Sequence, residues 1–200
     1  MLTLIAVVIA YLIGSISTST ILSRVIAGTD VRKHGSGNAG ATNMVRLLGI
    51  KWGIVVLVVD ALKGVAAVII AVLLCHGQIV GTYLSALAVI AGHNWPLFFG
   101  FRGGKGIATT IGVCLSVHQV VGPALLSGLV AIVLLLLTRY VSLASLCFTV
   151  LTPIFVGILG RGITTIVFTG IIALFSLYRH RQNITRLVRG QEHRLFSRSA

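Results

Sequence analysis

Seven apolar runs, separated by short polar segments, constrain the fold of this 200-residue chain more than any other feature of its sequence. A helix rises about 1.5 Å per residue, so a run of about 20 residues matches a hydrocarbon core of about 30 Å. With 56% hydrophobic and only 10% charged residues, the chain is predicted to be an all-α integral membrane protein. The runs cover residues 2–27, 52–74, 78–98, 107–117, 119–138, 140–159 and 163–178.

The run at residues 107–117 covers only about 16 Å as a helix, so length alone leaves six or seven crossings open. Seven is favoured because 14 of the 16 Lys and Arg then lie on one face, whereas six would place the basic tail opposite the first two basic loops. By the positive-inside rule that face and the C-terminus are cytoplasmic, and the N-terminus lies outside. We expect one domain over residues 1–200 with about seven transmembrane helices. The 14 residues are Arg24, Arg32, Lys33, Arg46, Lys51, Arg102, Lys105, Arg139, Arg179, Arg181, Arg186, Arg189, Arg194 and Arg198.

The net charge of +13 would suggest a nucleic-acid partner in a soluble protein, but the topology accounts for most of it, and we expect no nucleic acid to bind. The cysteines, Cys75, Cys114 and Cys147, lie in or beside apolar runs without C-x-x-C spacing. Neither a disulfide framework nor a zinc site is indicated, and no metal is expected.

A Gly-rich basic segment at residues 92–109 reads G-H-N-W-P-L-F-F-G-F-R-G-G-K-G-I-A-T. Consecutive glycines let backbone N–H groups converge on an anion, while Arg102 and Lys105 supply positive charge. A Walker A loop is excluded, because Phe99 and Gly106 occupy positions that need Gly and Ser or Thr. The segment is interpreted as a phosphate-binding loop, and the alternative is a basic turn between two helices.

A second Gly-rich segment, at residues 28–51, matches G-x-G-x-x-G between Gly35 and Gly40. A dinucleotide fold would need a preceding strand, whereas this match follows an apolar helix, so that interpretation is rejected. The segment still offers neutral hydrogen-bonding groups and the planar fork of Arg46, which suits a phosphate. The alternative is an ordinary polar loop. The neutral groups belong to Ser36, Asn38, Thr42 and Asn43.

Two charged residues, Asp60 and Lys63, lie three positions apart within an apolar run and so share one helical face. Charges inside a membrane are costly, so we expect them to form an ion pair that braces the loops. A structural role is favoured over direct contact with substrate.

The basic tail at residues 178–196 is predicted to continue the last helix, with Arg179, Asn183 and Arg186 on one face. An interfacial helix on anionic lipid is the alternative for its other arginines. Glu192 is one of three acidic residues and is expected to tie the tail to an arginine of another loop.

Five segments of the chain resemble, in order, motifs of the bacterial acyl-phosphate:glycerol 3-phosphate acyltransferases, over almost its whole length. They read G-S-G-N-A-G-A-T-N-M-V-R, D-A-L-K-G, the segment at residues 92–109, R-Y-V-S-L-A-S and Y-R-H-R-Q-N-I-T-R-L, the last followed by Gly190 and Glu192. The resemblance implies transfer of a fatty acyl group from acyl phosphate to the 1-hydroxyl of glycerol 3-phosphate. Lysophosphatidic acid and phosphate would form at the cytoplasmic face of the bacterial inner membrane, without cofactor, metal, CoA or carrier protein.

By position, the resemblance points to Ser36, Arg46, His93, Gly103, Gly104, Lys105, Ser142, His180, Asn183 and Glu192. The chemistry of the segments adds the other site residues named below. The expected catalytic residues are Ser36, Arg46, Lys105, Ser142, His180 and Asn183. The expected phosphate-binding residues are Gly37, Asn38, Gly40, Asn43, His93, Gly103, Gly104 and Gly106. Structural roles are expected for Asp60, Lys63 and Glu192.

No histidine has an acidic residue five positions on, so a histidine oriented by a carboxylate is hard to assemble locally. We therefore predict substrate-assisted catalysis, in which a substrate phosphate accepts the hydroxyl proton, Arg46 and Lys105 hold the phosphates, and Ser36 and Ser142 orient them. The alternative is His180 or His93 as general base.

Two other functional classes fit the sequence less well. A transporter of anions or phosphorylated metabolites should place its site near the midplane and show related halves, but the polar motifs lie on one predicted face and no internal repeat is visible. A structural lipid-binding protein would leave both Gly-rich segments unexplained. The expected partners are acyl phosphate, glycerol 3-phosphate and membrane lipid.

Overall fold

The computed structural model describes residues 1–195, and all regular structure in this part of the chain is helical, which confirms the predicted all-α fold. The chain divides into two compact units, Met1–Ser116 and a second that begins at Val117. That residues 1–200 act as one domain stays a prediction. Phe196 and Arg198, which the sequence assigns to the basic tail, lie outside the described residues.

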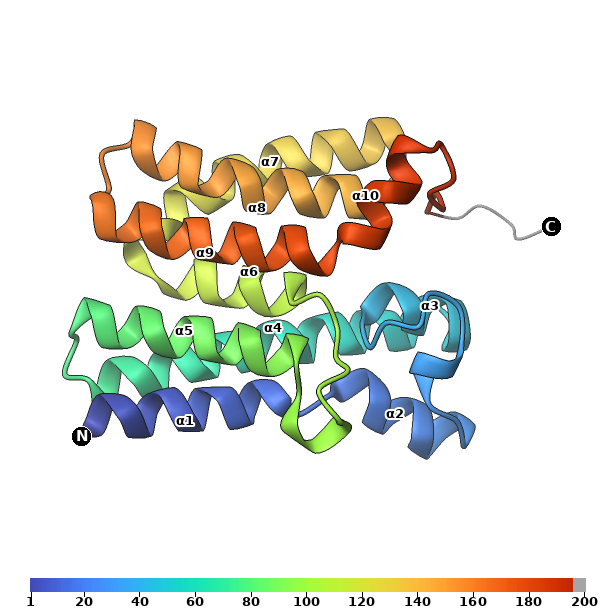
Figure 1. Cartoon of the computed structure of the whole chain (residues 1–200), viewed down its shortest axis with the longest axis horizontal. Coiled ribbons are helices and arrows are strands. Elements are labelled where there is room, and N and C mark those ends of the chain that lie inside the picture. The colour runs from blue at the N-terminus through green and yellow to red at the C-terminus, as the bar shows by residue number, and fades with distance from the viewer. Residues whose placement is uncertain (196–200) are drawn as a thin grey trace. The chain divides into compact units, whose positions relative to one another are not determined.

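The first unit contains six α-helices and two short 3-10 helices, and in it α1 packs against α5 while α4 packs against α6 (Figure 1). The helices are α1 (Leu2–Ser15), α2 (Thr18–Ala27), α3 (Ala41–Leu48), α4 (Ile50–Leu74), α5 (Ile79–Asn94) and α6 (Ile107–Ser116), with η1 (Val31–Lys33) and η2 (Leu97–Phe99).

Glycines bring these helix pairs together. A Cβ atom at Gly14 or Gly92 would collide with backbone across the α1–α5 contact, and one at Gly64 or Gly112 would do so across the α4–α6 contact. Small residues at helix contacts suit a membrane, where close van der Waals approach, rather than hydrophobic burial, holds helices together.

The helix of the first apolar run is interrupted between α1 and α2. The charged pair of α4, Asp60 and Lys63, forms hydrogen bonds with polar groups at the interruption. Lys63 Nζ donates to the carbonyls of Gly14 (3.3 Å) and Ile16 (3.0 Å), and Asp60 accepts a hydrogen bond from the Thr18 hydroxyl (2.9 Å). Lys63 Nζ also lies 2.8 Å from Asp60 Oδ1, so the ion pair expected from the spacing is present. Because carbonyls freed inside an apolar segment must be satisfied internally, this geometry supports a structural role for the pair.

The second unit is built on three longer helices, with α8 packed against both α7 and α9 (Figure 1). Hydroxyl groups on these helices donate to the carbonyl four residues before them, as Thr152 does to Phe148 (2.7 Å), which satisfies them in apolar surroundings. The helices are α7 (His118–Thr138), α8 (Val141–Ile158), α9 (Ile163–Arg179) and the short α10 (Arg181–Val188).

The tail does not continue the last long helix, so that prediction is wrong. The chain bends by 64° between α9 and α10, at His180. The His180 ring is buried, and its Nδ1 lies 2.9 Å from the Ser176 carbonyl oxygen, which anchors the bend. Arg179 therefore ends α9, whereas Asn183 and Arg186 lie on α10.

By length and composition, four segments of the described chain could cross a membrane: α1 with α2, α4, α7 and α8. The bent pair of α9 and α10 would make a fifth. About seven crossings are predicted, and the difference lies in α5, α6 and α9, which have 16, 10 and 17 residues. Helix α5 is shorter than its apolar run because Trp95 precedes Pro96, and a residue before proline disfavours the helical conformation.

Candidate functional site

The first loop of the site, residues 28–40, is folded around the side chain of Asn43 on α3. The amide Nδ2 of Asn43 donates to the carbonyls of Val31 (2.9 Å), His34 (3.0 Å) and Asn38 (3.0 Å). Its Oδ1 accepts a hydrogen bond from the Ser36 N–H (3.1 Å). This side chain is buried and committed to the loop, so contact between it and a phosphate stays a prediction.

Ser36 and Arg46 are two residues of this region whose side chains remain available to a ligand. Ser36 is half-buried between Gly35 and Gly37, whose φ angles of 54° and 71° lie in the left-handed region that glycine tolerates. A side chain at Gly35 would collide with Asn43 Oδ1 and approach Arg46 Cδ, which places the Arg46 stem beside the loop. Arg46 is exposed and has no ion-pair partner among the described residues.

The second loop, residues 99–106, packs its glycines tightly against the end of α5 and the first loop. A Cβ at Gly104 would collide with the His93 ring and the Ala39 carbonyl oxygen, and one at Gly103 with the His93 carbonyl. The Gly104 N–H donates to the His93 carbonyl oxygen at 3.1 Å. Lys105 follows at once and is half-buried. The structure thus brings together the two Gly-rich loops that the sequence assigns to one site.

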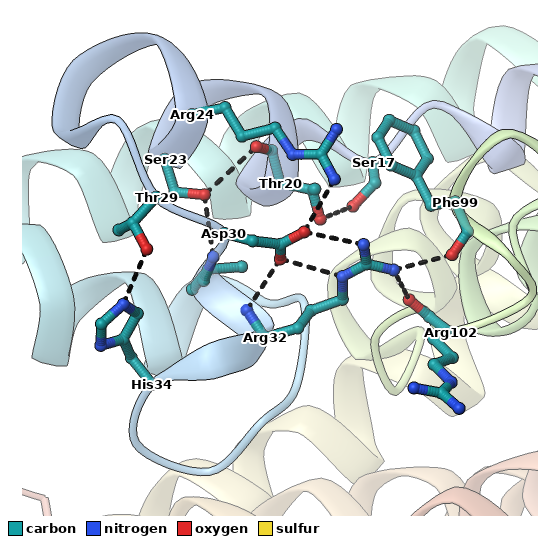
Figure 2. Close-up of polar contacts among 11 residues, drawn as sticks. Ser17, Thr20, Ser23, Arg24, Thr29, Asp30, Arg32, His34, Phe99 and Arg102 are labelled. Carbon is teal, nitrogen blue, oxygen red and sulfur yellow. Dashed lines mark hydrogen bonds and ion pairs between the residues drawn. The ribbon is translucent and has the colours of Figure 1, made fainter.

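A polar network that the sequence interpretation did not single out also joins the two loops (Figure 2). Asp30 forms ion pairs with Arg24 (2.8 Å) and Arg32 (2.7 Å). Arg32 Nη1 donates to the carbonyl oxygens of Phe99 (2.7 Å) and Arg102 (3.0 Å) in the second loop. The hydrogen bond from Arg32 is the main reason that the pKa of Asp30 lies well below its usual 3.8, and the same bond raises the pKa of Arg32.

A carboxylate does approach one of the candidate histidines, which local spacing could not indicate. His93 Nδ1 lies 3.8 Å from Asp60 Oδ1, although the two residues are far apart in the chain. That distance is too long for a hydrogen bond, and the same oxygen already receives hydrogen bonds from Lys63 and Thr18. Asp60 and His93 therefore do not form a well-oriented carboxylate–histidine dyad in this geometry.

In the second unit, Glu192 gathers three side chains around its carboxylate. Oε1 accepts hydrogen bonds from Asn183 Nδ2 (2.7 Å) and the Ser142 hydroxyl (3.0 Å), and Oε2 accepts one from Arg186 Nε (2.8 Å). Burial alone would raise the pKa of Glu192, but the hydrogen bonds from Arg186, Asn183 and Ser142 outweigh it and lower the pKa. We call these four residues the Glu192 cluster.

The arginine paired with Glu192 was expected in another loop, but Arg186 belongs to the same tail. Gly190 has a φ angle of 67°, so the chain reverses after α10 and returns Glu192 to that helix. The tie beyond the tail is instead the hydroxyl of Ser142, at the start of α8. Because Ser142 donates its proton to Glu192, this arrangement leaves it only acceptor lone pairs.

His180 is 1% exposed, and its Nδ1 lies 2.9 Å from the Ser176 carbonyl oxygen and 3.4 Å from the Ser176 hydroxyl. A carbonyl oxygen can only accept, so the 2.9 Å contact with the Ser176 carbonyl requires the proton to be on Nδ1. Nε2 then carries the lone pair of the neutral ring. A general-base role for His180 would have to use Nε2.

Comparisons with known proteins identify the family. A family model described as glycerol-3-phosphate acyltransferase matches residues 4–190. The glycerol-3-phosphate acyltransferase of Halalkalibacterium halodurans is 47% identical over 191 residues, which cover 93% of this chain and 92% of the relative. That of Shouchella clausii is 46% identical over 199 residues, covering 97% of this chain and 96% of the relative.

A solved structure leads to the same family. The crystal structure of PlsY, an integral membrane glycerol 3-phosphate acyltransferase, in its glycerol 3-phosphate form has a TM-score of 0.90 and 41% identity. The match covers 96% of this chain and 95% of that chain. The resemblance inferred from the five motifs is confirmed, and the chain belongs to the glycerol-3-phosphate acyltransferase family.

Proposed function

We propose that the protein transfers a fatty acyl group from acyl phosphate to the 1-hydroxyl of glycerol 3-phosphate, forming lysophosphatidic acid and phosphate for phospholipid synthesis. Both substrates carry phosphate, and one carries an acyl chain. The observation that carries the proposal is the contact between two Gly-rich, basic loops in a unit of apolar helices. Gly104 of the second loop lies against Ala39 of the first. Arg46 follows the first loop in the sequence, and Lys105 belongs to the second. Glycine backbone and basic side chains suit phosphate, and apolar helices suit the acyl chain.

In the proposed reaction, the 1-hydroxyl oxygen of glycerol 3-phosphate attacks the acyl carbonyl carbon. The bond from that carbon to the phosphate oxygen breaks, phosphate leaves, and a substrate phosphate accepts the hydroxyl proton. Arg46 and Lys105 neutralise the phosphates, while Ser36 and the glycine N–H groups orient them. An acyl phosphate is a mixed anhydride, so positioning and charge stabilisation supply much of the catalysis.

The Glu192 cluster supports a mainly positioning role for Ser142 and Asn183, because both donate to the carboxylate. A general-base role for His180 or His93 is the alternative mechanism. Replacing each histidine by Ala and measuring turnover against pH separates the two. Loss of several powers of ten, with disappearance of a pKa near about 6.5, would establish a histidine base and exclude substrate assistance.

We also propose that about seven segments cross a bacterial inner membrane, with the N-terminus outside and both Gly-rich loops and the C-terminus cytoplasmic. The asymmetric distribution of Lys and Arg supports this topology. It requires the short helices α5, α6 and α9 to cross, which single cysteines placed in each loop would test by their accessibility to an impermeant thiol reagent.

The activity is tested with detergent-purified protein, a saturated acyl phosphate and glycerol 3-phosphate, in the absence of any gradient. Phosphate release should require glycerol 3-phosphate and should match the lysophosphatidic acid formed, mole for mole. Phosphate release without glycerol 3-phosphate, or no release at all, would contradict the proposal. Movement of phosphate across a vesicle without acyl transfer would instead favour a transporter.

A further inference from the structure

We propose that Asp30 and Arg32 are positioning residues that hold the second loop in its phosphate-binding shape, by clamping the turn at residues 99–102. The expected effect on kcat/KM rests on the proposed function, whereas the expected effect on the structure of the loop does not. Both residues lie in the segment at residues 28–51, but outside the five motifs that carry the family resemblance.

Arg32 is well placed to act as a clamp because its guanidinium serves two loops at once. Nε and Nη2 bind the two carboxylate oxygens of Asp30 at 2.9 Å and 2.7 Å, a fork-to-fork pairing that fixes the plane of the group. The remaining nitrogen, Nη1, donates to the carbonyls of Phe99 and Arg102 (Figure 2). The Arg32 side chain is only 19% exposed.

The turn that receives these bonds has an unfavourable backbone. Gly100 and Phe101 have φ angles of 64° and 58°, both in the left-handed region. For a residue with a Cβ this conformation costs about 1–2 kcal/mol, so the fold must hold Phe101 in place. The turn has its own backbone hydrogen bond from the Phe101 N–H to the Pro96 carbonyl oxygen (2.9 Å), and Arg32 adds bonds to the carbonyls on both sides of Gly100 and Phe101.

The clamp is itself anchored by contacts within the first loop and with α2. Asp30 also accepts a hydrogen bond from the Arg32 N–H (3.0 Å), and Arg24 pairs with its other oxygen (2.8 Å). The next residue, Val31, donates its N–H to Ser23 Oγ on α2 (3.0 Å). The guanidinium of Arg32 is thus oriented by Asp30 of its own loop, in addition to its contacts with the loop that it holds.

The effect on the site follows from the order of residues along the second loop. The clamped turn ends at Arg102, and Gly103, Gly104 and Lys105 come next. Releasing the two carbonyls would let the turn relax and move Lys105 and the glycine N–H groups. A displacement of about 1 Å at a substrate-positioning group can reduce turnover by about 100-fold.

The first experiment compares Arg32→Gln with Lys33→Gln, which removes the same charge from an exposed neighbour in η1. We expect Arg32→Gln to lower kcat/KM by about 100-fold, and Lys33→Gln to stay within about twofold of the native value. If Arg32→Gln does not fold, Arg32→Lys keeps the charge without the fork and should show a smaller loss in the same direction. Native kcat/KM in a folded Arg32 variant would overturn the proposal.

The second experiment asks whether the loss acts through the turn. Adding Phe101→Gly to an Arg32 variant should recover about tenfold in kcat/KM, because glycine adopts the left-handed conformation without strain. The Phe101 side chain is 54% exposed, so its removal disturbs little burial. Turnover is corrected for the folded fraction, because relief of backbone strain at Phe101 would also offset a general loss of stability. Absence of recovery after this correction would contradict the clamp.

Hydrogen exchange measured by mass spectrometry tests the clamp without any substrate. In Arg32→Gln or Arg32→Lys, amides at residues 99–106 should exchange faster, while those of α4 and α5 keep their native rates. Unchanged exchange in the loop, or faster exchange throughout the first unit, would overturn the clamp. If the native protein transferred no acyl group, the proposed function would fail, yet this measurement would still decide the clamp.

Discussion

The Gly-rich loops of the first unit and the Glu192 cluster of the second both gather basic and polar side chains, but they use them differently. In the Glu192 cluster, a carboxylate accepts hydrogen bonds from Ser142, Asn183 and Arg186, so these donors already have an anion. In the loops, the carboxylate of Asp30 is bound by Arg24 and Arg32, and Arg46 has no ion-pair partner among the described residues. Arg46, with no ion-pair partner among the described residues and beside glycine backbone, is suited to a phosphate from a substrate.

The largest effect is expected in Lys105→Ala, as a loss of activity that is much greater than any loss of stability. If Lys105 holds a phosphate in the transition state, its removal should lower kcat by about 10²–10³-fold. The unfolding temperature in detergent should change little. Steady-state kinetics, together with thermal unfolding, measure both.

Lys51→Ala is the matched control for that experiment. Lys51 is exposed, and its Nζ lies over the Trp52 ring at 5.6 Å from the centroid. Its activity should stay within about twofold of native. Equal losses in the two lysine variants would mean that net charge matters rather than the position of Lys105.

A smaller loss is expected for Arg46, and its size should depend on the fork of the guanidinium. Hydrogen bonds to charged groups contribute about 1.5–3 kcal/mol, so Arg46→Gln should lower kcat/KM by about 10–100-fold. Arg46→Lys should lie between that variant and native protein, because lysine keeps the charge without the planar pair of donors. Full activity in Arg46→Gln would remove the first loop from the phosphate site.

In the Glu192 cluster we expect the opposite pattern, a loss of stability with little loss of activity. Glu192→Gln leaves Arg186 without its carboxylate partner and should lower the free energy of unfolding by about 1–3 kcal/mol. Activity per folded molecule should stay closer to native than in the Lys105 variant. Chemical or thermal unfolding gives the first quantity, and turnover corrected for the folded fraction gives the second. An inactive but fully stable Glu192→Gln would reverse the comparison.

The stabilising role of the Glu192 cluster should also appear as a pH dependence of the free energy of unfolding, which is a smaller effect. The folded-state pKa of Glu192 lies below its ordinary value of 4.5, so the folded protein binds this proton less readily than the unfolded chain. Its stabilisation is present above about pH 4.5 and is lost as the pH falls through the folded-state pKa. Asp30, with an ordinary value of 3.8, acts in the same direction. The stability difference between native protein and Glu192→Gln, measured by unfolding, should therefore narrow below about pH 4.5.

The sequence predicts those features whose causes are local. Apolar runs specify helices, and the three-residue spacing of Asp60 and Lys63 specifies their ion pair. The break between α1 and α2 is harder to predict, because the carbonyls that it frees are satisfied by Lys63, 47 residues beyond Ile16. The bend at His180 likewise has no proline or glycine beside it to mark it.

The residues of the candidate site likewise fall into those that local sequence indicates and those that depend on distant contacts. Glycines and basic residues in short motifs indicate a phosphate site and its two loops. Arg32 could not be chosen from its neighbours, because its acceptors Phe99 and Arg102 lie 67 and 70 residues away. Asn43 resembles a ligand in sequence, but its buried amide is consumed by the loop that it folds. Such assignments depend on tertiary contacts, which a polar residue type in a motif does not reveal.

Binding of glycerol 3-phosphate to detergent-purified variants, measured by isothermal titration calorimetry, tests the central claim most directly. If a loop of the first unit holds its phosphate, Lys105→Ala or Arg46→Gln should weaken binding by about tenfold or more. Glu192→Gln and Ser142→Ala should bind close to the native affinity. Native affinity in both loop variants, with binding lost in the Glu192 or Ser142 variant, would contradict the account.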